Sequence, residues 1–357
     1  MNRHRLRLGL IAAVALLLQA TFAGSLAAQD ATPAAEGVTV EQIAVVTPSS
    51  RTNQGWDQQA ADAAEAVAAE AGIEAVVAEN AGYDDITPVL RDLAAGGAGL
   101  IICHASGYQT VCPEFAAESG VPVAVIENPG AVAPMLVADI ETQAQEVAYL
   151  AGVLAGETTE SGTVGVVVSG EPPTWNYMTV GFAEGLAATN PDATMLYSVI
   201  GEAAYDDAAG ASRVTEQQIA AGADVIFGMG DGASFGMIQA IEDHNAQDGA
   251  SKVWFIDVIG DKQAEHGDVL LSSVLFDYSG IYQQMLDDLA AGTFGDVYTM
   301  DVENGGVRLL DLPEDLPQET KDAVAAAEEA IIAGEIEVSA IPDAEGMNAR
   351  IAELFPE

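Results

Sequence analysis

Basic residues are scarce in this chain: of 357 residues, 11 are Lys or Arg and 55 are Asp or Glu, giving a formal net charge of -44. A surface this negative repels the phosphates of nucleic acids and of anionic lipids. Beyond the N-terminal arginines there is no cluster of basic residues to hold a phosphorylated ligand. We therefore expect no nucleic-acid partner. The acidity fits both a high-salt habitat and the plain solubility of an exported protein.

Cysteine and histidine are also rare, with two Cys and four His. A metal site needs more ligands than Cys103, Cys112 and His104 provide. No G-x-S-x-G segment is present, and His104 has no evident nucleophile beside it. Paired carboxylates of the glycosidase type stay open, because chance pairs are common in so acidic a chain. We expect no metal, no cofactor and no turnover. The two cysteines form either a local disulfide or two buried free thiols.

Long apolar runs are confined to the N-terminus, where three arginines precede the apolar segment Leu8–Leu18 and the small residues of Ala23–Ala28. This order is typical of a secretory signal, and the run is short for a membrane span. We expect a signal peptide at 1–28, cleaved near Ala28, with an uncleaved anchor as the alternative. A flexible leader at 29–40 follows. The segment has no Cys for lipid attachment. Because the segment is typical of an export signal, the mature chain is expected outside the cytoplasm.

Short apolar runs alternate with longer Ala-rich stretches after the leader. The order β-α-β-α-β-α-β predicts a parallel sheet covered on both faces. The predicted strands are 43–46, 73–78, 100–103 and 123–126, and the helices between them are 58–71, 86–95 and 111–119.

The same pattern then begins again, and AAGGAGLIICHASG at 94–107 is similar in wording to AAGADVIFGMGDG at 220–232. We therefore predict an α/β fold of two doubly wound parallel-sheet lobes. The second set of strands is 164–168, 194–199, 225–227 and 253–256, with helices at 177–189, 208–221 and 235–245.

The remaining segments suit chain crossings between the lobes, which together form a hinge. Strand-like runs at 270–276 and 297–310 flank a helix at 279–291, and a final amphipathic helix is expected at 318–333. The predicted division is an N-terminal lobe of 41–140 plus about 277–296, a C-terminal lobe of 141–270 plus about 297–312, and a C-terminal helix and tail at 313–357.

Ligands of open parallel sheets bind beyond the carboxyl ends of the strands. Two of the three Trp fall in such loops, Trp56 and Trp175, and Tyr108 and Tyr205 join them. Rings in these places would stack on a flat aromatic ligand, although each ring alone also fits packing under a loop. Polar groups that would read the ligand's edge are Asp257, Asn128 and Asn53, whose alternative roles are helix capping and turn formation.

A dinucleotide enzyme is one rival hypothesis, because Gly228–Ala233 matches G-x-G-x-x-A and Asp257 ends the next strand. Asp231 opposes it, since its charge would lie beside a pyrophosphate. The matching loop of the first lobe, His104–Tyr108, also lacks the pattern. A sensor or receptor component with the same lobes stays open as a second rival.

The second half of the chain resembles a known family. The segment QEVAYLAGVLAG at 145–156 is similar to the QEAAYLAG signature of the BMP family, the basic membrane protein or PnrA-like binding proteins of ABC transporters. GTVGVVVSGEPP, GFAEGLAATNPDA, AAGADVIFGMGDG, FIDV and LLSSV follow that family in order, and Asn53–Asp57 resembles its D-x-G-[WF]-N loop. The resemblance covers roughly 41–338.

This resemblance implies a type I periplasmic-binding-protein fold that captures a purine nucleoside in the interlobe cleft. The partners would be the permease and ATPase subunits of an ABC importer, and a monomer is expected. Carried over from the family, Trp56 would stack on the base, Tyr205 would supply a second aromatic ring, and Asp257 would hold the ribose.

Three positions depart from the family pattern, and one of them, Phe276 in place of a lysine, points to a different or smaller ligand, such as a free nucleobase or a related flat heterocycle. Asp57 stands in place of the family's Asn, Asn53 or a neighbour in place of its first Asp, and Phe276 in place of a lysine that contacts ribose. The predicted ligand-binding set is Asn53, Trp56, Asp57, Tyr108, Asn128, Trp175, Tyr205, Asp231, Asp257 and Phe276.

Overall fold

The computed structural model of the chain describes residues 37–356. The predicted signal peptide and most of the predicted leader lie outside these residues. Between residues 37 and 356, none of the helices has both the length and the apolar character that a membrane crossing requires.

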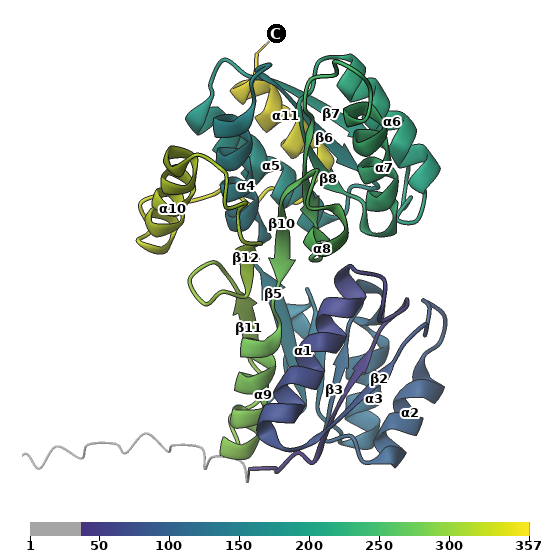
Figure 1. Ribbon diagram of the computed structural model, residues 1–357. Coiled ribbons are helices and arrows are strands. Elements are labelled where there is room, and N and C mark those ends of the chain that lie inside the picture. The colour runs from purple at the N-terminus through teal and green to yellow at the C-terminus, as the bar shows by residue number, and fades with distance from the viewer. Residues whose placement is uncertain (1–36, 357) are drawn as a thin grey trace, which may run out of the picture. The chain divides into compact units, whose positions relative to one another are not determined.

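The first lobe is built on a six-stranded parallel sheet with the order β11-β5-β4-β3-β1-β2. Its central strands read as unbroken apolar runs because helices cover both faces. Helices α1 and α9 lie on one face, and α2 and α3 lie on the other (Figure 1). The strands are β1 (Gln42–Val46), β2 (Glu74–Ala78), β3 (Leu100–Cys103), β4 (Val123–Ile126), β5 (Val137–Thr142) and β11 (Val297–Met300). The helices are α1 (Trp56–Ala71), α2 (Thr87–Gly96), α3 (Val111–Ser119) and α9 (Ser279–Ala291).

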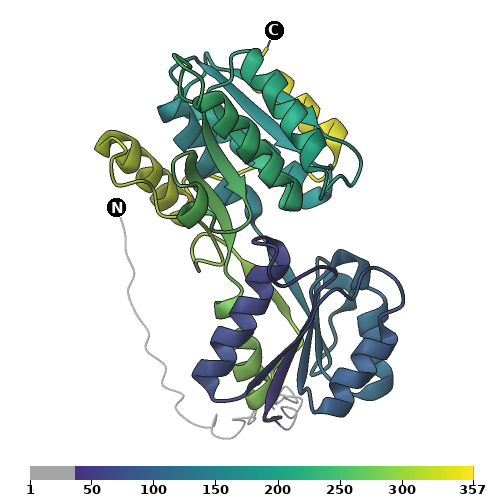
Figure 2. The same cartoon turned by 45° about the vertical axis from the view of Figure 1, so that its right-hand side comes forward.

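The second lobe repeats this plan in a sheet of order β12-β10-β9-β8-β6-β7, in which β12 alone runs antiparallel to its neighbour. Helices α4 and α5 cover one face, and α6 and α7 cover the other (Figure 2). The strands are β6 (Thr163–Val168), β7 (Thr194–Val199), β8 (Val225–Met229), β9 (Trp254–Val258), β10 (Leu270–Phe276) and β12 (Val307–Leu309). The helices are α4 (Ala144–Thr158), α5 (Pro173–Thr189), α6 (Ala208–Ala220), α7 (Ser234–Asn245), the short α8 (Gln263–His266), α10 (Gln318–Ile332) and α11 (Ala344–Leu354). The prediction of two doubly wound α/β lobes is confirmed.

The chain crosses between the two sheets three times, from β5 into α4, from β10 into α9, and from β11 into β12. The boundary predicted for the last crossing is wrong, because Val297–Met300 pairs with β5 in the first sheet rather than joining the second lobe. Helix α10 is also not the final helix, since α11 follows it and packs on α5.

The QEVAYLAG segment lies in α4, and its glycine lets this helix touch α5 closely. A Cβ atom on Gly152 would lie 2.1 Å from the Phe182 carbonyl oxygen. The facing glycines of α5 meet α4 in the same way: a Cβ on Gly181 or Gly185 would lie 2.2 Å or 2.0 Å from a backbone oxygen of α4. Only glycine permits such backbone contact, so this motif encodes helix packing within the second lobe.

Cys103 and Cys112 form a disulfide between the end of β3 and the start of α3, with their Cα atoms 6.6 Å apart. This is one of the two alternatives that the sequence left open. Both residues are fully buried beside the apolar contacts of α2 and α3, so the crosslink anchors the loop that carries His104–Tyr108.

Removing this crosslink should lower stability. A closed loop of this length contributes about 2–3 kcal/mol in the chain-entropy description, so the double variant Cys103→Ser, Cys112→Ser should unfold at lower denaturant concentration than the parent. The check is urea unfolding with and without dithiothreitol. The reductant should weaken the parent and leave the double variant unchanged; a reductant-insensitive parent would contradict the assignment.

Candidate functional site

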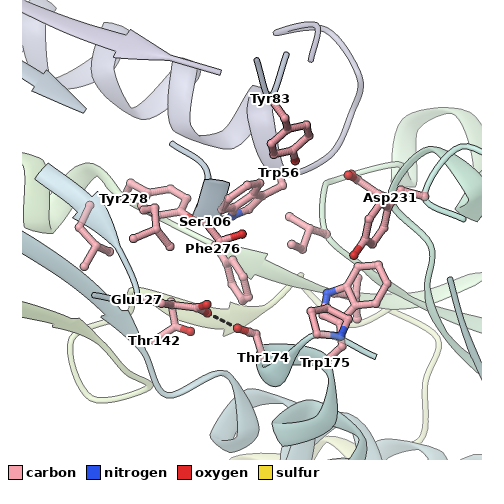
Figure 3. A pocket seen from close by; sticks show the side chains of 16 residues that line it. Trp56, Tyr83, Ser106, Glu127, Thr142, Thr174, Trp175, Asp231, Phe276 and Tyr278 are labelled. Carbon is pink, nitrogen blue, oxygen red and sulfur yellow. Dashed lines mark hydrogen bonds between the residues drawn. The ribbon is translucent and has the colours of Figure 1, made fainter. Parts of the chain in front are cut away.

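A cavity of about 910 Å³, including the part open to solvent, lies between the lobes at the carboxyl ends of the strands. Within residues 37–356, no lysine or arginine lines it. Figure 3 shows aromatic and acidic side chains directed into it from both lobes. Its walls are formed by Trp56, Tyr83, Ser106, Ile126, Glu127, Ile140 and Thr142 of the first lobe, by Pro172, Thr174, Trp175, Tyr205, Asp231, Val258 and Ile259 of the second, and by Phe276 and Tyr278 at the β10–α9 crossing.

Trp56, the first residue of α1, is fixed in place from behind. Its Nε1 donates a 2.7 Å hydrogen bond to the hydroxyl of Tyr278. Its ring centroid lies 3.8 Å from that of His104, whose Nε2 is 3.2 Å from the Trp56 carbonyl oxygen. Burial lowers the pKa of His104 to about 3, so this imidazole is neutral. The indole is thus held rigid before any ligand arrives.

The second lobe supplies the facing aromatic wall. Trp175 lies in the first turn of α5, and Tyr205 lies in the loop between β7 and α6. Their ring centroids are 5.4 Å apart in an edge-to-face arrangement, which is favourable for aromatic pairs. The cavity therefore has indole and phenol rings on both sides, as a flat ligand would require.

Glu127 and Thr174 join the lobes across the cavity. The Thr174 hydroxyl donates a hydrogen bond to the Glu127 carboxylate (Figure 3). Glu127 is the first residue after β4, and Thr174 belongs to the first turn of α5. Burial raises the pKa of Glu127 despite this bond, because the carboxylate has little water around it.

Asp231 brings a second carboxylate into the cavity, at a left-handed backbone position with φ of 53° between two glycines. It packs against the loop before α1, where a Cβ on Gly55 would lie only 2.4 Å from Asp231 Oδ1. This Oδ1 is buried and has no hydrogen-bond partner among the described residues. Burial raises the pKa of Asp231, and the Trp56 amide and Lys262 nearby offset this only in part. The negative charge of this carboxylate would repel a bound pyrophosphate, which argues against the dinucleotide hypothesis.

Asn53 and Asp57 support the α1 loop and do not line the cavity. Asn53 Nδ2 donates to Asp57 Oδ2 at 2.8 Å, and Asn53 Oδ1 accepts from the Gly55 amide at 3.0 Å. Asp57 is 2% exposed. Burial first, and then the charge of Asp231, raise the pKa of Asp57 to about 6.

Asp257 is fully buried and does not line the cavity. Its Oδ1 accepts from the Ser234 hydroxyl at 2.8 Å, and its Oδ2 lies 2.5 Å from Lys262 Nζ. The same ammonium donates to the carbonyl oxygens of Gln54, in the first lobe, and Ile259, each at 2.9 Å. Asp257 is thus bonded to Lys262, whereas we expected it to bind the ribose of a ligand.

Two further predicted residues have structural partners outside the cavity. The Tyr108 hydroxyl donates to the Gly82 carbonyl oxygen at 2.6 Å, and its ring is buried. Asn128 Nδ2 donates to the Gln109 carbonyl oxygen at 3.0 Å. Of the ten predicted residues, the structure gathers Trp56, Trp175, Tyr205, Asp231 and Phe276 in the cavity, and leaves Asn53, Asp57, Tyr108, Asn128 and Asp257 behind its walls.

Sequence reasoning did not single out Glu127, Tyr278 and Tyr83 as site residues. Glu127 directly follows β4, Tyr278 comes two residues after β10, and Tyr83 lies in the loop after β2. The strand-end rule that selected Trp56 applies to all three. Lys262 carried no comparable signal, because its loop after β9 has no distinctive pattern.

The fold is that of a two-lobed α/β binding protein, and its cavity lies between the lobes, where such proteins commonly bind ligands. The chain matches the family model of the ABC transporter substrate-binding protein PnrA-like group, Bmp, over residues 40–342. It belongs to this family of ABC transporter substrate-binding proteins.

Two curated relatives differ in what their names say they bind. The ABC transporter nucleoside-binding protein BmpA of Lactococcus lactis is 28% identical over 206 residues, which are 54% of this chain and 57% of that protein. The putative ABC transporter glucose-binding protein TsgA13 of Haloferax volcanii is 27% identical over 321 residues, covering 89% of this chain and 78% of that protein.

A solved structure shares the fold. A solute-binding protein of an ABC transporter system from Aeropyrum pernix superposes with a TM-score of 0.74 at 20% identity, covering 88% of this chain and 97% of that one.

Replacing the buried cation should destabilise the protein strongly. In Lys262→Met, Asp257 would stay buried without its counter-ion, and removing one partner of such a pair costs about 3–5 kcal/mol. Adding Asp257→Asn should restore part of this loss. Thermal unfolding of both variants is the measurement, with Lys252→Met, an exposed lysine, as the control. A single variant as stable as the parent would be incompatible with the described pair.

Asp57 should make stability depend on pH. The folded protein holds this proton up to about pH 6, because its pKa is raised there, whereas the unfolded chain releases it near the ordinary aspartate pKa of 3.8. Stability therefore falls as pH rises through this interval, by about 3 kcal/mol at most. Asp57→Asn should reduce this dependence and stabilise the protein at neutral pH.

The measurement is the melting temperature of parent and variant between acidic and neutral pH. Asp62→Asn, an exposed position on the same helix, is the control. Parallel curves for the parent and Asp57→Asn would show that Asp57 keeps an ordinary pKa.

Proposed function

We propose that this chain captures a purine-type flat heterocycle outside the cytoplasm, a free nucleobase or a nucleoside, and passes it unchanged to the permease and ATPase subunits of an ABC importer. The observation that carries this proposal is the pair of aromatic walls, with Trp56 on one lobe and Trp175 and Tyr205 on the other, around one cavity. Stacking of a base on such rings is worth about 1–3 kcal/mol per base.

The polar surroundings favour an unphosphorylated ligand. Carboxylates line the cavity and, in the described chain, no basic side chain does. Within the purines, a nucleobase fits better than a nucleoside. Phe276 occupies the cavity wall without a hydrogen-bonding group, and Asp257 already has both oxygens bonded. Neither residue offers a free group to ribose hydroxyls.

Contacts between the lobes support capture by closure. Thr174 binds Glu127 at one edge of the cavity, and Lys262 binds the Gln54 carbonyl oxygen of the other lobe. Both contacts form only when the lobes are together. Three chain crossings allow the hinge motion that would separate them, so an importer partner would distinguish the closed form.

Trp56→Ala should weaken binding of the preferred purine about tenfold or more, because it removes one stacking surface worth about 1–3 kcal/mol. Isothermal titration of the parent with adenine, guanine, hypoxanthine, their nucleosides and glucose identifies that ligand. Trp254→Ala is the matched control, since Trp254 lies in β9 away from the cavity lining.

Equal affinity of the Trp56→Ala variant and the parent would move the site elsewhere. Preference for glucose over every purine would replace the proposed ligand class with a sugar. Recovery of a chemically altered ligand after incubation would indicate an enzyme instead of a carrier.

A further inference from the structure

We propose that the ligand enters this cavity as an organic cation, held by aromatic rings and by the carboxylates of Asp231 and Glu127. The inference rests on the proposed function in one respect, that this cavity is the ligand site. It adds the charge of the ligand, which the fold and the relatives' names leave open.

The charges around the cavity do not balance. Asp231 and Glu127 line it, and Asp57 lies directly behind Asp231. Among the described residues, Lys262 is the one cation whose charge acts on Asp231, and its ammonium is bonded to Asp257. A cationic ligand would supply the missing positive charge.

The hydrogen bonding of these carboxylates is incomplete as well. Oδ1 of Asp231 and Oδ1 of Asp57 are both buried, and neither has a partner among the described residues. Buried polar atoms without partners are rare and costly. Asp231 is part of the cavity wall, but its Oδ1 packs against the loop before α1, near Gly55 and the Trp56 amide, so Asp231 acts on a ligand through its charge. Asp57, at 2% exposure, contributes through its charge.

The rings suit a cation as well as a flat neutral group. Trp56, Trp175, Tyr83 and Tyr205 all line the same cavity, close to Asp231. Indole and phenol faces attract cations, and several rings around one ammonium form the aromatic cages known for quaternary amines. A carboxylate placed among such rings adds ion pairing in a site with little water.

The test uses two pairs of probes that differ in charge; the members of the first pair also differ by one methyl group, and those of the second are matched in shape. Adenosine and 1-methyladenosine, which is cationic at neutral pH, form the purine pair. Choline and 3,3-dimethylbutan-1-ol, its uncharged analogue, form the pair without a purine. We expect the cation of a pair to bind about tenfold or more tightly than its neutral partner, since cation–π contact and ion pairing both favour it.

Variants connect the preference to the carboxylates. Asp231→Asn and Glu127→Gln should each reduce the ratio of cation affinity to neutral-probe affinity, and together they should abolish the preference. Glu202→Gln removes an equal charge from an exposed position near Tyr205 and should keep the full preference. Circular dichroism of each variant verifies that it folds.

The outcomes separate the two proposals. If adenosine binds as tightly as 1-methyladenosine, the charge inference is wrong and the purine proposal stands. If adenosine, 1-methyladenosine and the free nucleobases all fail to bind but choline binds more tightly than its analogue, the purine proposal is wrong and the charge inference stands. The charge inference is also wrong if neither pair shows a preference for the cation. It is wrong as well if a preference survives in the double carboxylate variant.

Discussion

The arrangement of the site depends on the hydrogen bonds that the Lys262 ammonium donates. The ammonium has three acceptors, one carboxylate and two carbonyl oxygens, and one of these belongs to the opposite lobe. In this closed arrangement the ammonium is buried and needs acceptors, and the Gln54 carbonyl oxygen, drawn close to the β9–α8 loop, is one of them. Gly260 makes the approach possible, because a Cβ there would lie 2.0 Å from the Gln54 oxygen. The loop that begins α1 is thereby held against the second lobe, and with it Trp56.

This arrangement divides the acidic residues near the cavity into two kinds. Asp257 is neutralised by Lys262 and takes part in holding the lobes together. Within residues 37–356, Asp231, Asp57 and Glu127 form no salt bridge with a lysine or arginine, and burial raises the pKa of each. The excess of acid over the whole chain does not explain this, because exposed carboxylates are solvated and cost little, whereas these have lost water. Their unbalanced charge is a property of the site.

Much of the fold was readable because strands buried on both faces must be continuous apolar runs. The strand that escaped notice breaks this rule, because β5 carries Asp139 and Glu141 among its six residues. It lies beside β11, the edge strand of the first sheet. The rule that ligands bind beyond the carboxyl ends of parallel strands pointed to the region of the cavity, and five of the ten predicted residues line it. It could not reveal that Asp257 would be occupied, since that depends on a lysine in a loop without a pattern.

The segment that identifies the family says little about the ligand. Its glycine, Gly152, allows α4 to touch α5, and this contact lies within the second lobe. Packing of this kind is compatible with any ligand, which accounts for relatives of similar identity whose names specify a nucleoside and a sugar. In the proposed site, ligand choice would depend on side chains at the strand ends, among them Asp231, Glu127 and Phe276. These positions can change without disturbing either sheet, so the specificity of this chain has to be inferred from its own cavity and not from the family it belongs to.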